Sequence, residues 1–188
     1  MLASCLFFFP LFVRAESDIL PGNLFLAAAL KALDYDRKID RLSQGSVVIG
    51  IIYINGDEPA EDFARKVMNN FQDIRFNTKL NNLPVELKSL GLDRTVDKKT
   101  LEKQFKQNNI SVALVAIQDP DTNKILFEMT RSLGVDSVCY SSVCDKQGSG
   151  IGVVVKENRV GFLVNMSAVK QEGSDYSGQF LDLCQAVK

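Results

Sequence analysis

Hydrophobic positions recur along the chain with two different periods, and the period separates strands from helices. Residues 47–53 (VVIGIIY) form an uninterrupted apolar run rich in β-branched side chains, which is typical of a strand covered on both faces. Residues 24–39 instead place Leu26, Leu30 and Leu33 at helical spacing after a Pro-Gly-Asn breaker. The first pattern predicts a central strand, and the second predicts an amphipathic helix that precedes it.

The same two patterns alternate through the middle of the chain. Asp57 and Asp97 each stand before a helix-spaced apolar pattern, so both are expected helix N-caps. The other predicted elements here are strands over residues 84–90, 111–117 and 135–140, and a helix over residues 122–133 that ends at Gly134. Strands that alternate with helices at this spacing predict an α/β fold with a mainly parallel sheet flanked by helices.

The last third of the chain has a different pattern. Residues 153–156 and 159–165 predict a β-hairpin. Phe180, Cys184 and Val187 follow at helical spacing, so we expect a closing helix with these three side chains on one face. The expected fold is therefore one α/β domain with a C-terminal hairpin and a closing helix.

Residues 1–15 (MLASCLFFFPLFVRA) have the character of a signal peptide. The segment is apolar up to Arg14, and Val13 and Ala15 occupy the two positions that a signal peptidase reads. It is too short for a membrane span, which needs about 20 apolar residues. We therefore expect export to the periplasm, cleavage after Ala15, and a single mature domain over residues 16–188 that does not span the membrane.

Composition and charge narrow the function. The chain has 188 residues, 46% of them hydrophobic and 24% charged, with a formal net charge of -1. This is the composition of an ordinary globular domain. Because no excess of Lys and Arg is available to neutralise phosphates, nucleic acid is not an expected partner.

The chain contains no histidine, which excludes Ser-His-Asp and Cys-His catalysis and every histidine metal site. Gly148, Gly150 and Gly152 have GxGxG spacing, but a predicted strand follows them, so a bend at a strand entrance is favoured over a phosphate-binding loop. We expect no catalytic residue, metal or cofactor. A hydrolase that uses paired carboxylates stays open as a third alternative.

Carboxylates follow two of the predicted strands, where α/β proteins commonly bind ligands. These are Asp57 with Glu58, and Asp119 with Asp121. Helix capping is the simpler explanation of both pairs.

Three cysteines remain after removal of residues 1–15: Cys139, Cys144 and Cys184. In an oxidising compartment, Cys139 and Cys144 are expected to form a local disulfide, because only four residues separate them. A structural staple is favoured over a redox switch. Cys184 is expected to be a small core residue.

Two longer stretches resemble the YfiR/HmsC-like family. The first is LKALDYDR at residues 30–37 followed by VVIGIIY at 47–53, and the second is VGFLVNMSAVK at 160–170 followed by FLDLCQAVK at 180–188. In that family an amphipathic helix precedes the first strand, and a strand that ends in Asn, here Asn165, opens the last helical segment. The resemblance covers residues 24–188, and Asn165 itself is expected to bond the backbone at this turn.

The resemblance implies a periplasmic regulator that binds the periplasmic domain of an inner-membrane diguanylate cyclase and represses it, which would control cyclic di-GMP and biofilm formation. Tyr35, Asp36 and Arg37 are the candidate partner contacts, although capping and bracing of the helix end is the favoured explanation of these residues. A homodimer is a further candidate assembly. The alternative is a periplasmic receptor for a small ligand, bound at the ends of the parallel strands.

Overall fold

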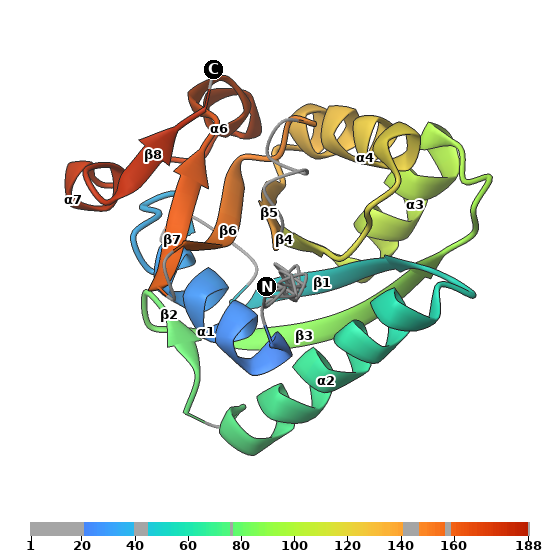
Figure 1. Cartoon of the computed structure of the whole chain (residues 1–188), viewed down its shortest axis with the longest axis horizontal. Coiled ribbons are helices and arrows are strands. Elements are labelled where there is room, and N and C mark those ends of the chain that lie inside the picture. Colours follow the sequence, from blue (N-terminus) through green and yellow to red (C-terminus); the bar gives the residue numbers. More distant parts are fainter. Residues whose placement is uncertain (1–20, 40–44, 76, 141–146, 157–158, 188) are drawn as a thin grey trace, which may run out of the picture.

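An eight-stranded mixed sheet runs through the molecule in the order β2-β3-β1-β4-β5-β6-β7-β8 (Figure 1). The computed structural model describes residues 21–39, 45–75, 77–140, 147–156 and 159–187. The strands are β1 (Val47–Ile54), β2 (Lys79–Leu80), β3 (Leu83–Leu92), β4 (Val112–Val115), β5 (Asp136–Cys139), β6 (Ile151–Lys156), β7 (Arg159–Val164) and β8 (Cys184–Ala186). The helices are α1 (Gly22–Leu33), α2 (Glu58–Ile74), α3 (Lys98–Asn108), α4 (Pro120–Leu133), α6 (Met166–Glu172) and α7 (Gly178–Leu181).

Most neighbouring strands are parallel, and within the described residues β2–β3 and β6–β7 are the antiparallel pairs of the sheet. The predicted α/β fold with a mainly parallel sheet and a C-terminal hairpin is therefore confirmed. The chain passes from β1 to β3 on one side and then crosses to β4 on the other side of β1. The carboxyl ends of β1 and β4 thus flank a topological switch point, where open α/β sheets bind ligands.

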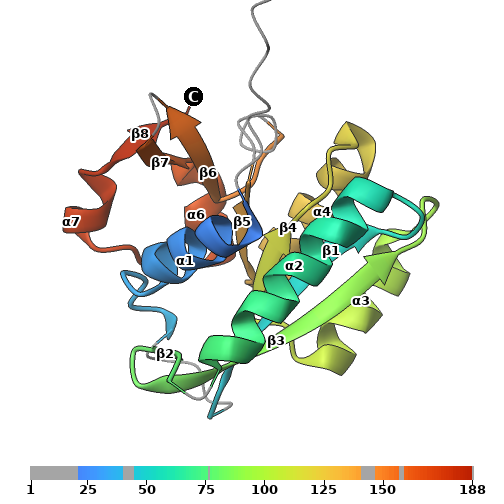
Figure 2. The same ribbon diagram turned by 60° about the horizontal axis from the view of Figure 1, so that its bottom comes forward.

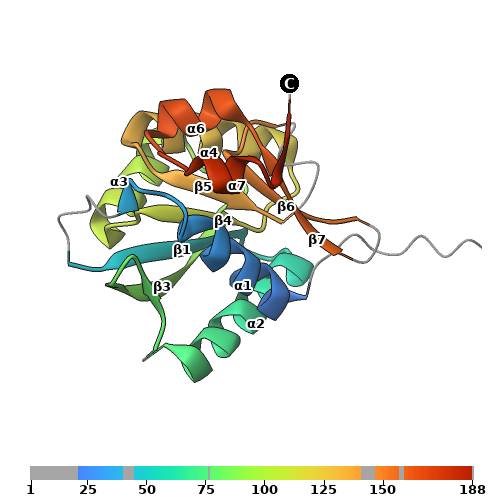
Figure 3. The same ribbon diagram turned by 90° about the vertical axis from the view of Figure 1, so that its left-hand side faces the viewer.

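The sheet is buried on both faces because β1 alternates between two apolar clusters. Ile49 and Ile51 pack with Phe25 of α1 and Phe63 of α2, whereas Ile52 packs in the other cluster, with the core of α3 and α4. Figure 2 shows α1 and α2 on one face, and Figure 3 shows the sheet between these helices and α4. An uninterrupted apolar strand is what burial on both faces requires.

The predicted caps are in place. Asp57 and Asp97 accept hydrogen bonds from the backbone N–H groups three residues later, and Asp119 does the same for α4. Asn165 caps α6 by accepting from Ala168 N at 3.1 Å, which confirms its structural role. These side chains satisfy amide groups that the first turn of a helix leaves without partners.

The predicted closing helix is wrong. The helix ends after one turn at α7, and Cys184–Ala186 form β8, which pairs in parallel with β7. Leu183 is 67% exposed, so the segment does not bury one continuous face. The physical reason is that β7 would otherwise present an open edge, and pairing with β8 satisfies backbone groups that helical spacing alone does not reveal.

Several boundaries also differ from the predictions. The first helix ends at Leu33 instead of residue 39. Strand β3 is longer than the predicted 84–90, because it pairs with β1 along the whole length of β1, from Val47 to Ile54. None of the helices in the described segments combines the length and hydropathy that a membrane crossing requires. The predicted signal peptide, residues 1–15, lies outside the described residues.

Candidate functional site

A cavity of about 300 Å³ lies at the carboxyl edge of the sheet, next to the switch point. It is lined by Ile54 at the end of β1, Asp57 before α2, Arg94 after β3, and Asp119 and Thr122 at the start of α4. The three loops meet because the parallel strands β1, β3 and β4 all end at this edge. The sequence located two of these carboxylates but gave no reason to include Arg94.

Two helices begin at the cavity, and their caps hold its acidic side chains in place. Asp119 Oδ2 accepts from Thr122 N at 2.8 Å, and Asp57 Oδ1 accepts from Ala60 N at 3.5 Å. Both carboxylates therefore cap helices, as the simpler explanation of the sequence predicted. Each carboxylate lines the cavity and keeps acceptor capacity beyond its capping hydrogen bond.

Charges of both signs meet in this cavity. Hydrogen bonds from Thr122 hold the pKa of Asp119 below its usual value, and the nearby Arg94 guanidinium lowers it further. Asp119 is therefore ionised at neutral pH, and Arg94 is an exposed cation that adjoins it. The arrangement can bind a small polar molecule that carries both charges.

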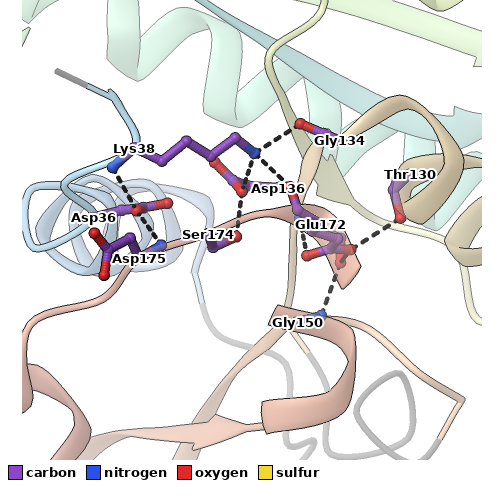
Figure 4. A network of polar contacts seen from close by, with 10 residues as sticks. Asp36, Lys38, Thr130, Gly134, Asp136, Gly150, Glu172, Ser174 and Asp175 are labelled. Carbon is purple, nitrogen blue, oxygen red and sulfur yellow. Dashed lines mark hydrogen bonds and ion pairs between the residues drawn. The ribbon is translucent and has the colours of Figure 1, made fainter. Parts of the chain in front are cut away.

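The second polar site is a buried network at the opposite edge of the sheet (Figure 4). Lys38, in the segment after α1, donates to Asp136 Oδ1 at 2.7 Å, Gly134 O at 2.7 Å and Glu172 O at 2.8 Å. Only 17% of the Lys38 side chain and 3% of the Asp136 side chain are exposed. One ammonium group thus joins the segment after α1 to β5 and α6.

The Asp136 carboxyl begins β5 and has an altered acidity. Burial raises its pKa to about 6, against the opposing effect of Lys38, and Asp36 adds repulsion. Ser174 also donates a short hydrogen bond to Asp136 Oδ1. The one feature of the sequence that could have indicated this network is Asp136, a charged residue at the start of the short apolar strand β5.

The three candidate partner contacts lie beside this network. The Tyr35 ring stacks on Phe180 with 5.6 Å between centroids. The Asp36 side chain is fully buried, and its Oδ1 accepts from Lys38 N and from Asp175 N at 2.7 Å.

Arg37 is the exposed member of the three candidates. It forms an ion pair with Asp175, with 2.7 Å between Nη2 and Oδ1. The three residues therefore brace the end of α1 against the segment before α7, and their role as partner contacts stays a prediction.

The cysteines give no reactive pair in the described residues. Cys139 is buried, with its Sγ 3.2 Å from Ser149 Oγ. The predicted disulfide partner, Cys144, lies outside the described residues, so that pairing stays a prediction. Partial burial raises the pKa of Cys184 to about 11, which keeps this sulfur in the unreactive thiol form at neutral pH.

No clusters of three or more His, Cys, Asp or Glu side chains suited to a metal ion occur among the residues that the structure describes. Gly148 and Gly150 precede β6 and Gly152 is its second residue, which agrees with the strand-entrance interpretation. Gly150 also allows close packing, because a Cβ there would lie 2.5 Å from Glu172 Oε2.

Comparison with known proteins gives a fold but no family. No protein-family model and no curated protein matches the sequence. Among solved structures, a conserved domain protein from Vibrio cholerae O1 biovar El Tor has a TM-score of 0.66 at 11% identity, over 92% of this chain and 62% of its own.

Two other solved structures are similar to this chain. The ABC domain from Streptococcus pneumoniae in complex with L-Trp has a TM-score of 0.60 at 10% identity, over 89% of this chain and 60% of its own. The ligand-free, open form of a substrate-binding protein with adhesive properties from Clostridium difficile has a TM-score of 0.60 at 12% identity. The match covers 92% of this chain and 61% of that protein. This chain spans about three fifths of the length of these neighbours, and at such identities the likeness establishes the α/β fold alone.

Proposed function

We propose that this chain is a binding protein without catalytic activity, and that it holds a small zwitterion of amino-acid size in the cavity at the switch point. The observation that carries the proposal is the meeting of Arg94, Asp57 and Asp119 at the carboxyl edge of the sheet. A guanidinium group pairs well with a carboxylate, and the two acidic caps suit an ammonium group.

The size of the cavity limits the ligand. About 300 Å³ is at the lower end of the range for small-molecule sites, which suits an amino acid better than a nucleotide. The neighbour that was solved with L-Trp supports a ligand of this class for a chain with this fold. We further propose that the protein works in the periplasm after removal of residues 1–15, as a receptor for its ligand.

Thermal-shift measurements with each of the twenty amino acids test this function. We expect at least one to raise Tm by about 5–10 °C at a concentration 100 times its Kd, because only the folded state binds it. Arg94→Gln should abolish the rise. Arg65→Gln is the matched control, because Arg65 is an exposed cation on α2 that pairs with Asp62. Flat Tm values across the panel, or an undiminished rise in Arg94→Gln, would contradict the proposal.

A second candidate is the periplasmic regulator, which binds and represses the sensor domain of a membrane diguanylate cyclase. One observation favours it: the two stretches that resemble the YfiR/HmsC-like family pack against each other although they are far apart in sequence. Tyr35 of the first stretch stacks on Phe180 of the second, and Asp36 forms a β-bridge with Tyr176, which lies between the two parts of the second stretch. The exposed Arg37 lies on the surface of this unit.

Capture of partners from envelope extract tests the regulator. We expect the wild-type protein to retain a membrane diguanylate cyclase, and Arg37→Glu to reduce its recovery about tenfold, as loss of a charge pair at an interface does. Arg65→Glu serves as the control of equal charge change. Absence of any cyclase from the captured proteins, together with unchanged cyclic di-GMP after deletion of the gene, would refute this candidate.

A further inference from the structure

Glu172 joins three elements through one buried carboxyl group at the end of α6. The residue is 1% exposed. Its Oε1 lies 2.5 Å from Ser137 Oγ and 2.9 Å from Thr130 Oγ, and its Oε2 accepts from Ser137 N at 3.2 Å. The carboxyl therefore connects α6 to β5 and to α4, as Figure 4 shows.

The charged groups around this carboxyl do not neutralise it. Lys38 donates to the backbone oxygen of Glu172 and to Asp136, and Arg131 of α4 donates to a backbone carbonyl. Asp136 of β5 adds a repulsive charge, and Tyr176, from the segment before α7, is a buried neutral phenol. Within the described residues, the Glu172 carboxyl forms no salt bridge, so an ionised form would be a buried charge without a counterion.

The neutral acid fits the same geometry. Ser137 Oγ donates to an ionised Oε1 at 2.5 Å; a proton on Oε1 reverses this hydrogen bond, and Ser137 Oγ, which also accepts from Gly150 N at 2.8 Å, becomes the acceptor. Thr130 Oγ lies 3.0 Å from Phe127 O and can donate there instead. Every polar atom of the protonated carboxyl then has a partner, which the buried site demands.

We propose that Glu172 is a pH-sensitive latch, whose neutral carboxyl holds α6 and the adjoining strands β6 and β7 against β5 and α4, and whose ionisation loosens them. This device is independent of the cavity at the opposite edge of the sheet. Burial raises the Glu172 pKa to about 8 with a smaller contribution from Asp136, although the hydrogen bonds from Ser137 and Thr130 act in the opposite direction. Because the folded pKa lies above the ordinary value of 4.5, the stabilisation is complete below pH 4.5 and is lost as pH rises through about 8.

Because the sequence contains no histidine, few other groups titrate in the pH range in which Glu172 is expected to ionise. No imidazole titrates between pH 6.5 and 9, and the raised pKa of Asp136, about 6, lies below that range. We expect the Tm of the full chain to fall by about 4–8 °C from pH 6.5 to pH 9. The Ser137 amide, which donates to Glu172 Oε2, should titrate in ¹H–¹⁵N spectra with a midpoint near 8.

Glu172→Gln is the decisive variant, because its amide NH₂ can donate to both hydroxyls while its carbonyl accepts from Ser137 N. We expect its Tm to change by less than about 2 °C over the same range. Glu102→Gln, at a partly exposed carboxyl on α3, should keep the wild-type slope. A wild-type slope in Glu172→Gln would overturn the latch. If that variant does not fold, the wild-type spectra decide: a Ser137 amide that does not titrate between pH 6.5 and 9 overturns it as well.

Discussion

Replacement of Lys38 by methionine is expected to lower the free energy of unfolding by about 3–5 kcal/mol at pH 8. The ammonium group is the only salt-bridge partner of Asp136 within the described residues, and both side chains are largely buried. Methionine fills a similar volume but leaves the Asp136 carboxylate, together with the backbone oxygens of Gly134 and Glu172, without that donor. Urea unfolding followed by circular dichroism measures the change.

The control for this substitution is Lys66→Met on α2. Lys66 forms an ion pair with Asp62 at 2.6 Å, but 64% of its side chain is exposed, so we expect a loss below about 1 kcal/mol. The Lys38→Met effect should also shrink as pH falls, because protonation of Asp136 removes the unpaired charge. Equal losses in the two variants would show that the buried network contributes no more than a surface pair.

Truncation of Phe180 to alanine should have an effect of similar size, about 3–5 kcal/mol. The ring is 1% exposed and contacts three aromatic neighbours, with centroid distances of 5.6 Å to Tyr35, 5.2 Å to Phe162 and 5.1 Å to Tyr176. These neighbours come from the end of α1, from β7 and from the segment before α7. Loss of the ring therefore leaves a cavity where three parts of the chain meet.

Leu183→Ala provides the matched comparison three residues later. Because Leu183 is 67% exposed, its truncation should change stability by less than about 0.5 kcal/mol. The two variants also distinguish the observed structure of the C-terminal segment, a one-turn helix followed by β8, from a continuous closing helix. A Leu183→Ala loss as large as that of Phe180→Ala would be incompatible with this arrangement.

The central sheet and its helices were predictable because local patterns there agree with the tertiary structure. An apolar run such as VVIGIIY is stable as a strand that is buried on both faces between two layers of helices, and β1 has this position. Asp57 and Asp97 could be assigned as caps because capping depends on neighbours only three residues away. The position of the candidate binding edge followed from the same order of elements.

What could not be predicted depends on residues that are distant in sequence. β8 forms because β7 offers an open edge, and no local property of residues 184–186 records that edge. Lys38, Asp136 and Glu172 are three ordinary charged residues in the sequence, and only the fold places them together. Arg94 likewise joins the cavity through the end of β3, whose length is set by its pairing with β1.

In the proposed function, the protein acts through a small-ligand site at the carboxyl edge of its sheet. ¹H–¹⁵N spectra recorded during titration with each amino acid test this claim residue by residue. We predict saturable shifts at the amides of Gly56, Asp57 and Thr122, next to the cavity. Spectra that no amino acid changes, or saturable shifts confined to residues around Lys38 and Glu172 at the opposite edge, would contradict it.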